Sequence, residues 1–317
     1  MHLEDAVALK PIVLGFDGSE GSELALDWAL GAARGRGTSV RIVQAWRSFV
    51  EPWPAFGGYA DPDPSLLITA AEETLAAALA TAHRTAPQIP VETHLVNGGA
   101  AAALIEESSQ AEIVVVGSRG LGGFGELMLG STAVEVAAHA HCPVVVIRPD
   151  TSDVAPGAEA GRVVVGVDGS VLSIDALAFA FGEAFLRARG LTAVHAWHRP
   201  SYDAPGKGAP IAASVGDTVF RGPELQALRD ALATWREKLP AVDVREAVRN
   251  ANPAAALIAA SAGAELLVVG SRGRGGFASL VLGSVSHAVL HHAHCPVAVV
   301  RPIGTKDPHR TAGSGPD

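Results

Sequence analysis

Short apolar runs alternate with longer amphipathic segments along the whole chain. The runs are rich in valine and isoleucine and lack polar alternation, which is typical of strands buried on both faces of a parallel sheet. In the first half this pattern predicts strands at Pro11–Phe16, Val40–Trp46, Val91–Val96, Glu112–Val116 and Val144–Arg148. In the second half it predicts strands at Arg162–Val167, Thr192–Trp197, Val242–Val248, Glu265–Val269 and Val297–Arg301.

The segments between these runs carry alanine and leucine at helical spacing. They predict helices that include Glu20–Arg34, Ser65–Arg84, Leu172–Ala188 and Pro223–Leu239. Alternating strands and helices indicate an α/β fold with two tandem doubly wound domains. We expect each domain to be a five-stranded parallel sheet with helices on both faces, Rossmann-like or flavodoxin-like, in the strand order 3-2-1-4-5. Ligands of such sheets bind at the carboxyl ends of the strands.

The second half of the chain repeats the first. Asp17 matches Asp168 after 151 residues, and Gly117 matches Gly270 after 153. A length of 317 residues also suits two domains. We therefore expect a domain over residues 1–150, a linker over 151–161, a second domain over 162–303 and a polar tail over 304–317.

Composition and charge narrow the class of protein. Hydrophobic residues make up 48% of the chain and charged residues 18%, as in a compact protein. The net charge of −9 should repel nucleic acid and anionic lipid, so we expect neither as a partner. The longest apolar runs are strand-length, and we expect no membrane segment and a cytoplasmic location. Cys142 and Cys295 each lie in a His-Cys-Pro tripeptide, which favours two reduced, buried thiols over a disulfide.

A glycine-rich segment follows the fourth predicted strand of each half. The repeated spacing is Gly117-Ser-Arg-Gly120, nine residues, then Gly130-Ser131, and again Gly270-Ser-Arg-Gly273, nine residues, then Gly283-Ser284. The serines are placed to open a helix. Glycine permits a positive φ and a close backbone approach, and the amides of a helix start attract anions. The pattern therefore predicts two phosphate sites that need no metal ion.

Each first strand ends in Gly-x-Asp-Gly-Ser, with Gly15 and Asp17 in the first half and Gly166 and Asp168 in the second. The carboxylate should face the same crevice as the glycine loop. It has two interpretations: it contacts the base or sugar of a nucleotide, or it caps the helix that follows. Its recurrence beside both glycine loops favours ligand contact.

In each half the spacing G-x2-G-x9-G-[ST] follows the fourth strand, and an aspartate ends the first strand. This combination resembles that of the universal stress proteins, and the resemblance covers the whole chain as two copies. It is similar to the ATP-binding branch of that family in its tandem, actinobacterial form. The resemblance implies one ATP in each domain. It implies that Asp17 and Asp168 recognise adenine or ribose, and that Ala45 and Ala196, where valine is commoner, lie near the base.

The same resemblance implies that the loops and helix starts hold ribose and phosphates. The implied residues are Gly117, Ser118, Arg119, Gly120, Gly123, Gly130, Ser131 and Thr132, and Gly270, Ser271, Arg272, Gly273, Gly276, Gly283, Ser284 and Val285. The two arginines either lend charge to the triphosphate or are solvated loop residues. Magnesium can accompany ATP, but no protein ligand is assigned to it.

We expect a stress-response sensor or regulator rather than a metabolic enzyme, and we assign no catalytic residue. The sequence has no Gly-x4-Gly-Lys-[Ser/Thr] loop, no kinase catalytic-loop motif and no Ser/Cys–His nucleophile motif. One alternative is a slow ATPase or phosphotransferase with Asp17 and Asp168 as bases. Another alternative is a flavin or dinucleotide carrier. The glycine loop follows the fourth strand rather than the first, which argues against this alternative.

Three further features leave alternatives open. His287 and His291, in a cluster with His292 and His294, share a helix face at a zinc-binding spacing, but the absence of a Cys pair favours surface histidines and no metal. Segments 47–64 and 199–222 are lids, partner surfaces or ordinary variable loops.

The resemblance further implies a pseudo-dimer of the two domains through their fifth strands, and a homodimer of chains.

Overall fold

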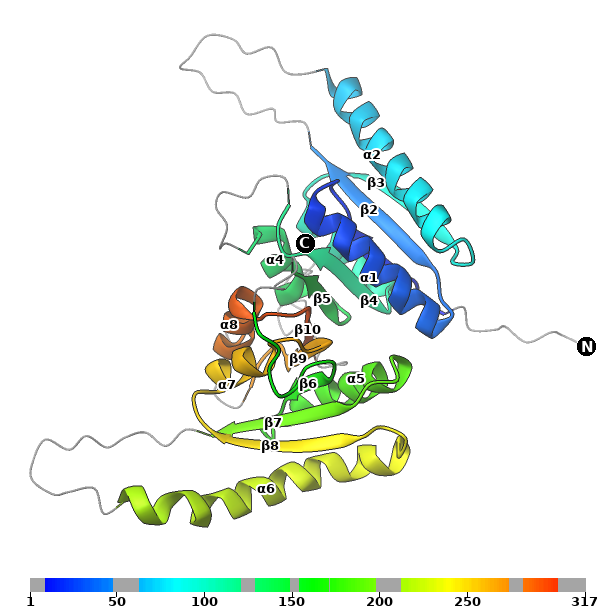
Figure 1. The fold of residues 1–317 in the computed structure, drawn as a ribbon. Coiled ribbons are helices and arrows are strands. Elements are labelled where there is room, and N and C mark those ends of the chain that lie inside the picture. The colour runs from blue at the N-terminus through cyan, green and yellow to red at the C-terminus, as the bar shows by residue number, and fades with distance from the viewer. Residues whose placement is uncertain are drawn as a thin grey trace, which may run out of the picture.

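The computed structural model describes residues 9–47, 63–120, 129–148, 154–170, 172–197, 212–273 and 282–301, and in these ranges strands and helices alternate (Figure 1). The first half contains β1 Ile12–Gly15, α1 Glu20–Arg36, β2 Val40–Trp46, α2 Pro64–Thr85, β3 Val91–Asn97, α3 Ala100–Glu107, the 3-10 helix η1 Ser108–Gln110, β4 Ile113–Gly117, α4 Ser131–His139 and β5 Val144–Ile147. The second half contains β6 Val163–Gly166, α5 Leu172–Leu186, β7 Leu191–Trp197, α6 Ala212–Lys238, β8 Val244–Asn250, α7 Pro253–Ala260, β9 Leu266–Gly270, α8 Ser284–His292 and β10 Val297–Val300.

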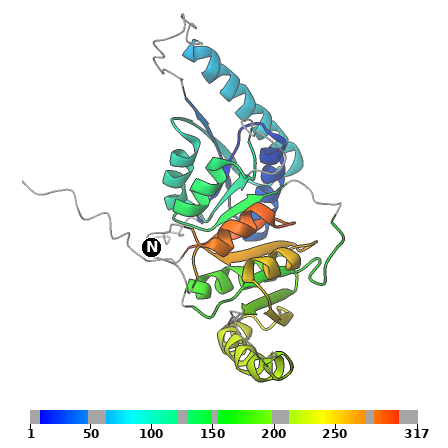
Figure 2. The ribbon, with the colours of Figure 1, turned by 90° about the vertical axis from the view of Figure 1, so that its left-hand side faces the viewer.

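All of these strands join one 10-stranded sheet in the order β3-β2-β1-β4-β5-β10-β9-β6-β7-β8. Each half therefore has the predicted order 3-2-1-4-5, and neighbours within a half are parallel. The predicted α/β, doubly wound fold is confirmed. Figures 1 and 2 show the two halves stacked along the sheet, with α2 and α6 at its opposite ends.

The two halves meet at an antiparallel pair, β5 and β10, in which Val144, Val145 and Val146 face Val299, Ala298 and Val297. The predicted pseudo-dimer through the fifth strands thus forms within one chain. Because the strands of one half run opposite to those of the other at this seam, the carboxyl ends of the two halves lie at opposite edges of the sheet. A homodimer of whole chains stays a prediction, and it needs a surface other than the β5 and β10 edges.

Helices cover both faces of the sheet, as the unbroken apolar strands predict. One core joins the sheet to α1, α2, α5 and α6, and a second joins it to α3, α4, α7 and α8. Each core crosses the seam, so the two halves share their apolar interior. Alanine dominates the buried face of α1, at Ala25, Ala29, Ala32 and Ala33, which lets the helix lie close to the strands.

Charged side chains lock α1 to α5 at the seam. The Glu183 side chain on α5 is 1% exposed and accepts from the Arg36 guanidinium of α1 and, at 2.9 Å, from Nε of Arg187. Arg187 also lies over the ring of Trp28 on α1, with its Cζ 4.7 Å from the ring centre. On the other face, Arg148 donates from Nη1 to the carbonyl oxygen of Leu290 in α8 at 2.6 Å. Removing the carboxylate would take the ion-pair partner from Arg36, whereas Arg187 would keep Glu265, whose Oε1 lies 3.2 Å from its Nη1.

Most predicted elements end within one or two residues of their observed bounds, and β8 and α6 show differences with a local cause. The strand predicted at Val242–Val248 is β8, Val244–Asn250, because the Val242 amide closes a turn onto the Leu239 carbonyl and the register places Val244 opposite Leu191. The helix predicted from Pro223 begins at Ala212, so Pro223 lies inside α6 and part of segment 199–222 is helical. Proline is common at a helix start, but here Pro223 removes one amide donor without ending the helix. The rest of segments 47–64 and 199–222 falls almost wholly outside the described residues, as does 304–317.

By length and mean hydropathy alone, α2 could cross a membrane. The unbroken apolar runs in the sequence do not predict such a helix. In the fold, Ala71, Leu75 and Ala78 of this helix are buried in the core that it shares with β2 and β3. Glu72 and Glu73, on its other side, are exposed. The apolar character of α2 therefore serves at least in part to cover the sheet.

We expect Glu183→Gln to lower the free energy of unfolding by about 3 kcal/mol, because breaking the buried ion pair leaves the charge of Arg36 without its carboxylate partner. Urea denaturation measures the change. Glu72→Gln, an exposed position on α2, is the control and should stay within about 0.5 kcal/mol of the wild type. Equal stabilities of the two variants would show that the seam does not depend on this carboxylate.

The two thiols should be inert in the folded protein. Burial raises the pKa of Cys142 and of Cys295 to about 12, so both stay protonated at pH 8 and do not present the nucleophilic thiolate. We expect Ellman's reagent to label neither thiol in the native protein at pH 8 and both after unfolding in guanidinium. Fast labelling of the native protein would contradict the packing of both His-Cys-Pro segments.

Candidate nucleotide site

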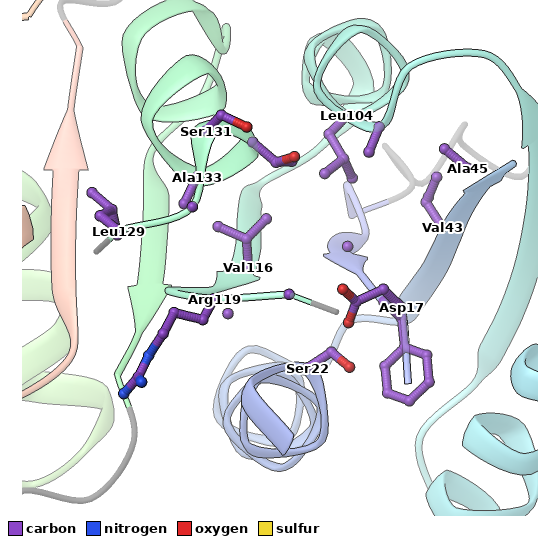
Figure 3. A pocket seen from close by; sticks show the side chains of 17 residues that line it. Asp17, Ser22, Val43, Ala45, Leu104, Val116, Arg119, Leu129, Ser131 and Ala133 are labelled. Atoms are coloured by element: carbon purple, nitrogen blue, oxygen red, sulfur yellow. The ribbon is translucent and has the colours of Figure 1, made fainter. Parts of the chain in front are cut away.

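A cavity of about 610 Å³ opens in the first half at the carboxyl ends of β1, β2 and β4, beside α3 and the start of α4 (Figure 3). The first-half candidates that line it are Gly15, Asp17, Ala45, Gly117, Arg119, Gly120, Gly130, Ser131 and Thr132. Ser118 is a candidate that does not line it, and Gly123 lies outside the described residues. The fold therefore brings the aspartate and the glycine loop, about a hundred residues apart in the chain, to one cavity.

The turn after β1 fixes the position of Asp17. Gly18 has a φ of +79°, a left-handed conformation that favours glycine. Ser19 caps α1 and donates to Oδ1 of Asp17 from its amide at 3.0 Å and from its hydroxyl at 2.6 Å. The helix cap is thus Ser19, and Asp17 holds the cap in place. Its second oxygen, Oδ2, faces the loop at Gly120.

The loop glycines are required by close approach rather than by a positive φ. None of Gly117, Gly120 and Gly130 has a backbone in the left-handed region, which corrects one reason given for them from the sequence. A Cβ on Gly117 would lie 2.7 Å from the carbonyl carbon of Gly21 in α1. A Cβ on Gly120 would collide with Oδ2 of Asp17. The backbone of the loop therefore packs directly on the turn that carries the aspartate.

Backbone hydrogen bonds close the two ends of the loop. The Ser118 amide donates to the Ile147 carbonyl at 2.7 Å, and the Gly130 amide donates to the Ser118 carbonyl at 2.8 Å. Ser118 is 3% exposed, so its role is to hold the loop from within. The helix α4 then starts at Ser131, as predicted, with Gly130 rather than serine as its cap. The first amides of α4 have no acceptor within the helix and lie at the cavity wall.

The two sides of the cavity differ in chemistry. Figure 3 shows Val43, Ala45 and Leu104 on one side and Ser131 and Ala133 on the other. The first side is apolar, and the second carries the amides and the positive dipole end of α4. Such an arrangement can bind a ligand with a flat apolar part and an anionic part.

Arg119 does not point into the cavity. Its side chain extends away from Asp17 and Ser131, toward β5 and the second half (Figure 3). Burial lowers the pKa of Arg148, at the end of β5, and the positive charge of Arg119 nearby lowers it further. In this conformation Arg119 contributes its backbone, whose carbonyl lies 3.4 Å from the Ser19 hydroxyl, rather than its charge. Whether Arg119 lends charge to a bound triphosphate or stays a solvated loop residue remains a prediction.

The second half repeats the contacts among the aspartate, the serine after it and the glycine loop. Ser170 donates to Oδ1 of Asp168 from its amide at 2.9 Å and from its hydroxyl at 2.6 Å. A Cβ on Gly273 would lie 2.6 Å from Oδ2 of Asp168. The Gly283 amide closes the loop onto the Ser271 carbonyl at 2.7 Å.

The remaining second-half candidates take the places of their first-half counterparts. Gly166 and Gly270 end β6 and β9, and Ala196 lies in β7. Ser284 and Val285 open α8, after Gly283 as the cap. Arg272 follows Ser271 in the loop, and Gly276 lies outside the described residues.

The described residues contain few candidate ligands for a metal ion. No group of three or more His, Cys, Asp or Glu side chains with metal-binding geometry occurs among them. Asp17 is the carboxylate that lines the cavity, and one of its oxygens already accepts twice from Ser19. A magnesium ion here would be held mainly by phosphates and water, as this ion commonly is. The rings of His287 and His291 lie with their centres 4.5 Å apart and their planes tilted by 37°, and burial together with His287 lowers the pKa of His291.

Sequence reasoning missed several residues of the cavity wall, which are Phe16, Ser22, Val43, Ala100, Leu104, Val116, Leu129 and Ala133. Val43 lies two residues before Ala45 and so points to the same face of β2, a signal that the strand period carries. Leu104 has no such signal, because α3 approaches the cavity only in the folded chain.

Comparison with known proteins identifies the family. The model of the universal stress protein family matches residues 8–148 and again 159–301. A universal stress protein from Mycobacterium tuberculosis is 37% identical over 296 residues, covering 92% of this chain and 96% of that protein. One from Mycolicibacterium smegmatis is 36% identical over 298 residues, covering 92% and 97%.

Solved structures share the fold. A universal stress protein from Archaeoglobus fulgidus DSM 4304 covers 93% of this chain and 98% of its own, with a TM-score of 0.66 and 21% identity. Two shorter universal stress proteins, described as complexes with cAMP and with dAMP, match 44% of this chain with TM-scores of 0.34 and 0.33. Those nucleotides are ligands of those proteins. On the two family matches and the identity to the mycobacterial relatives, this chain belongs to the universal stress protein family and carries two of its domains in tandem.

Proposed function

We propose that this protein binds ATP, one molecule in each half, and acts in the cytoplasm as a stress-response sensor or regulator. The observation that carries the proposal is the first-half cavity, with an apolar side at Val43, Ala45 and Leu104 and a helix start at Ser131 opposite. Its volume of about 610 Å³ lies in the ordinary range for small-molecule sites. Adenine would occupy the apolar side, and the phosphates would lie at the amides of α4.

Asp17 lies on the adenine side of this arrangement, next to Val43 in Figure 3. Its carboxylate can accept hydrogen bonds from ribose hydroxyls or from the adenine amino group. The turn at Gly18 and the Ser19 contacts hold it before any ligand arrives, so little ordering is needed on binding. Asp168 is held in the same way in the second half.

The side chains at the cavity favour a bound ligand over a substrate for phosphoryl transfer. Enzymes of that class surround the transferred phosphate with lysine, arginine or carboxylate-held metal. Among the described lining residues, Arg119 is the basic one, and its guanidinium points away. We therefore infer that the nucleotide state, rather than turnover, conveys the signal.

Alanine at Gly120 should weaken ATP binding in the first half about tenfold, because the new Cβ displaces the Asp17 carboxylate. Gly273→Ala should do the same in the second half through Asp168. Isothermal titration with ATP measures both. Gly31→Ala, in α1 with no atom near the added Cβ, is the control and should bind ATP like the wild type. Unchanged affinity in both loop variants would show that the loops are turns without a ligand role.

Mass spectrometry of nucleotide released from the purified protein should find ATP, with up to two molecules for each chain. Turnover by the wild type should be slow, and Asp17→Asn combined with Asp168→Asn should weaken ATP binding. Fast, metal-dependent hydrolysis that this double variant abolishes would instead make the protein an enzyme with the aspartates as bases. A released flavin would favour the carrier alternative.

A further inference from the structure

The two nucleotide sites differ at the first turn of the helix that receives the phosphates. Thr132 is the second residue of α4 and lines the first-half cavity. Val285 occupies the same place in α8, 153 residues later. Threonine and valine have nearly the same shape, so the exchange replaces a hydroxyl with a methyl group and changes little else.

The Thr132 hydroxyl is available to a ligand. It makes no hydrogen bond with another residue in the part of the chain that the structure describes. Thr132 is half-buried, beside the amides that have no acceptor within α4. A phosphate oxygen at this helix start would therefore meet both backbone donors and a side-chain donor.

The next position differs as well, and it does not restore the lost donor. Ala133 lines the first-half cavity, and Ser286 stands at the matching place in α8. The Ser286 side chain is buried, and its hydroxyl donates at 2.6 Å to the carbonyl of Gly270, where the loop begins. This hydroxyl is used within the protein, where it ties the loop to the helix, and is not offered to a ligand.

We propose that the two sites are unequal, and that Thr132 gives the first half a hydrogen bond to phosphate that the second half lacks. This inference rests on the proposed function. The serines that open the helices, Ser131 and Ser284, are the same in both halves and cannot make the difference. Thr132 and Val285 are thus specificity-determining residues: the first half favours nucleotides with a phosphate chain, and the second half depends less on it.

The test separates the sites in the full chain. Gly273→Val blocks the second site, because its side chain meets the Asp168 carboxylate, and Gly120→Val blocks the first site through Asp17. In the Gly273→Val background, Thr132→Val should weaken ATP binding about tenfold or more, since a hydrogen bond to a charged group contributes that much. In the Gly120→Val background, Val285→Thr should strengthen ATP binding in the same proportion.

Two controls distinguish a phosphate contact from a change in the fold. Titration with adenosine, which has no phosphate, should give the same affinity for Thr132→Val and its parent. Thr132→Ser keeps the hydroxyl and should bind ATP within about threefold of its parent. If a blocked background does not fold, as judged by circular dichroism, the same substitutions in the unblocked chain are compared by two-site titration.

Equal ATP affinities for the two blocked chains would overturn the inference and leave the proposed function intact. Equal losses of ATP and adenosine affinity in Thr132→Val would also overturn it, because the residue would then act on the base or on packing. If neither half of the wild-type chain binds ATP, the proposed function fails, and the inference fails with it.

Discussion

The aspartate at the end of each first strand leaves no room for a side chain on the loop that follows the fourth strand. Oδ2 of Asp17 occupies the place that a Cβ on Gly120 would take, and Asp168 does the same to Gly273. Glycine at these two positions is therefore a packing requirement of the site. The contact joins the β1–α1 turn to the β4–α4 loop in the first half, and the wall of the cavity follows from that junction.

The glycines at the strand ends serve the same close packing. Gly117 lies against the backbone of Gly21 in α1, and Gly15 faces Leu104 of α3, whose Cδ1 would be 2.7 Å from an added Cβ. These contacts let helices on both faces of the sheet approach the carboxyl ends of β1 and β4. A cavity with an apolar side and a helix-start side results, although no single segment of the chain contains both.

The seam between the halves gives the duplicated domain its shared interior. The β5–β10 pair makes one sheet of the two, and Glu183 of α5 pairs with Arg36 of α1. Because this pair is antiparallel, the two candidate sites lie at opposite edges of the sheet. Duplication thus places the candidate sites apart, so a difference between the halves, such as Thr132 in one and Val285 in the other, belongs to one of them alone.

The sequence by itself determined the strands, their grouping into two halves and the residues of the glycine loops, because these depend on local period, on repetition and on spacing. It also placed Asp17 beside the loop, since parallel strands end at the same edge. It left open which property of glycine the loops need, a positive φ or a close backbone approach; the structure has the positive φ at Gly18 and requires close approach at Gly117 and Gly120. Only the tertiary structure turned Arg119 away from the cavity and brought Leu104 of α3 to its apolar side, because both depend on packing against segments far away in the chain.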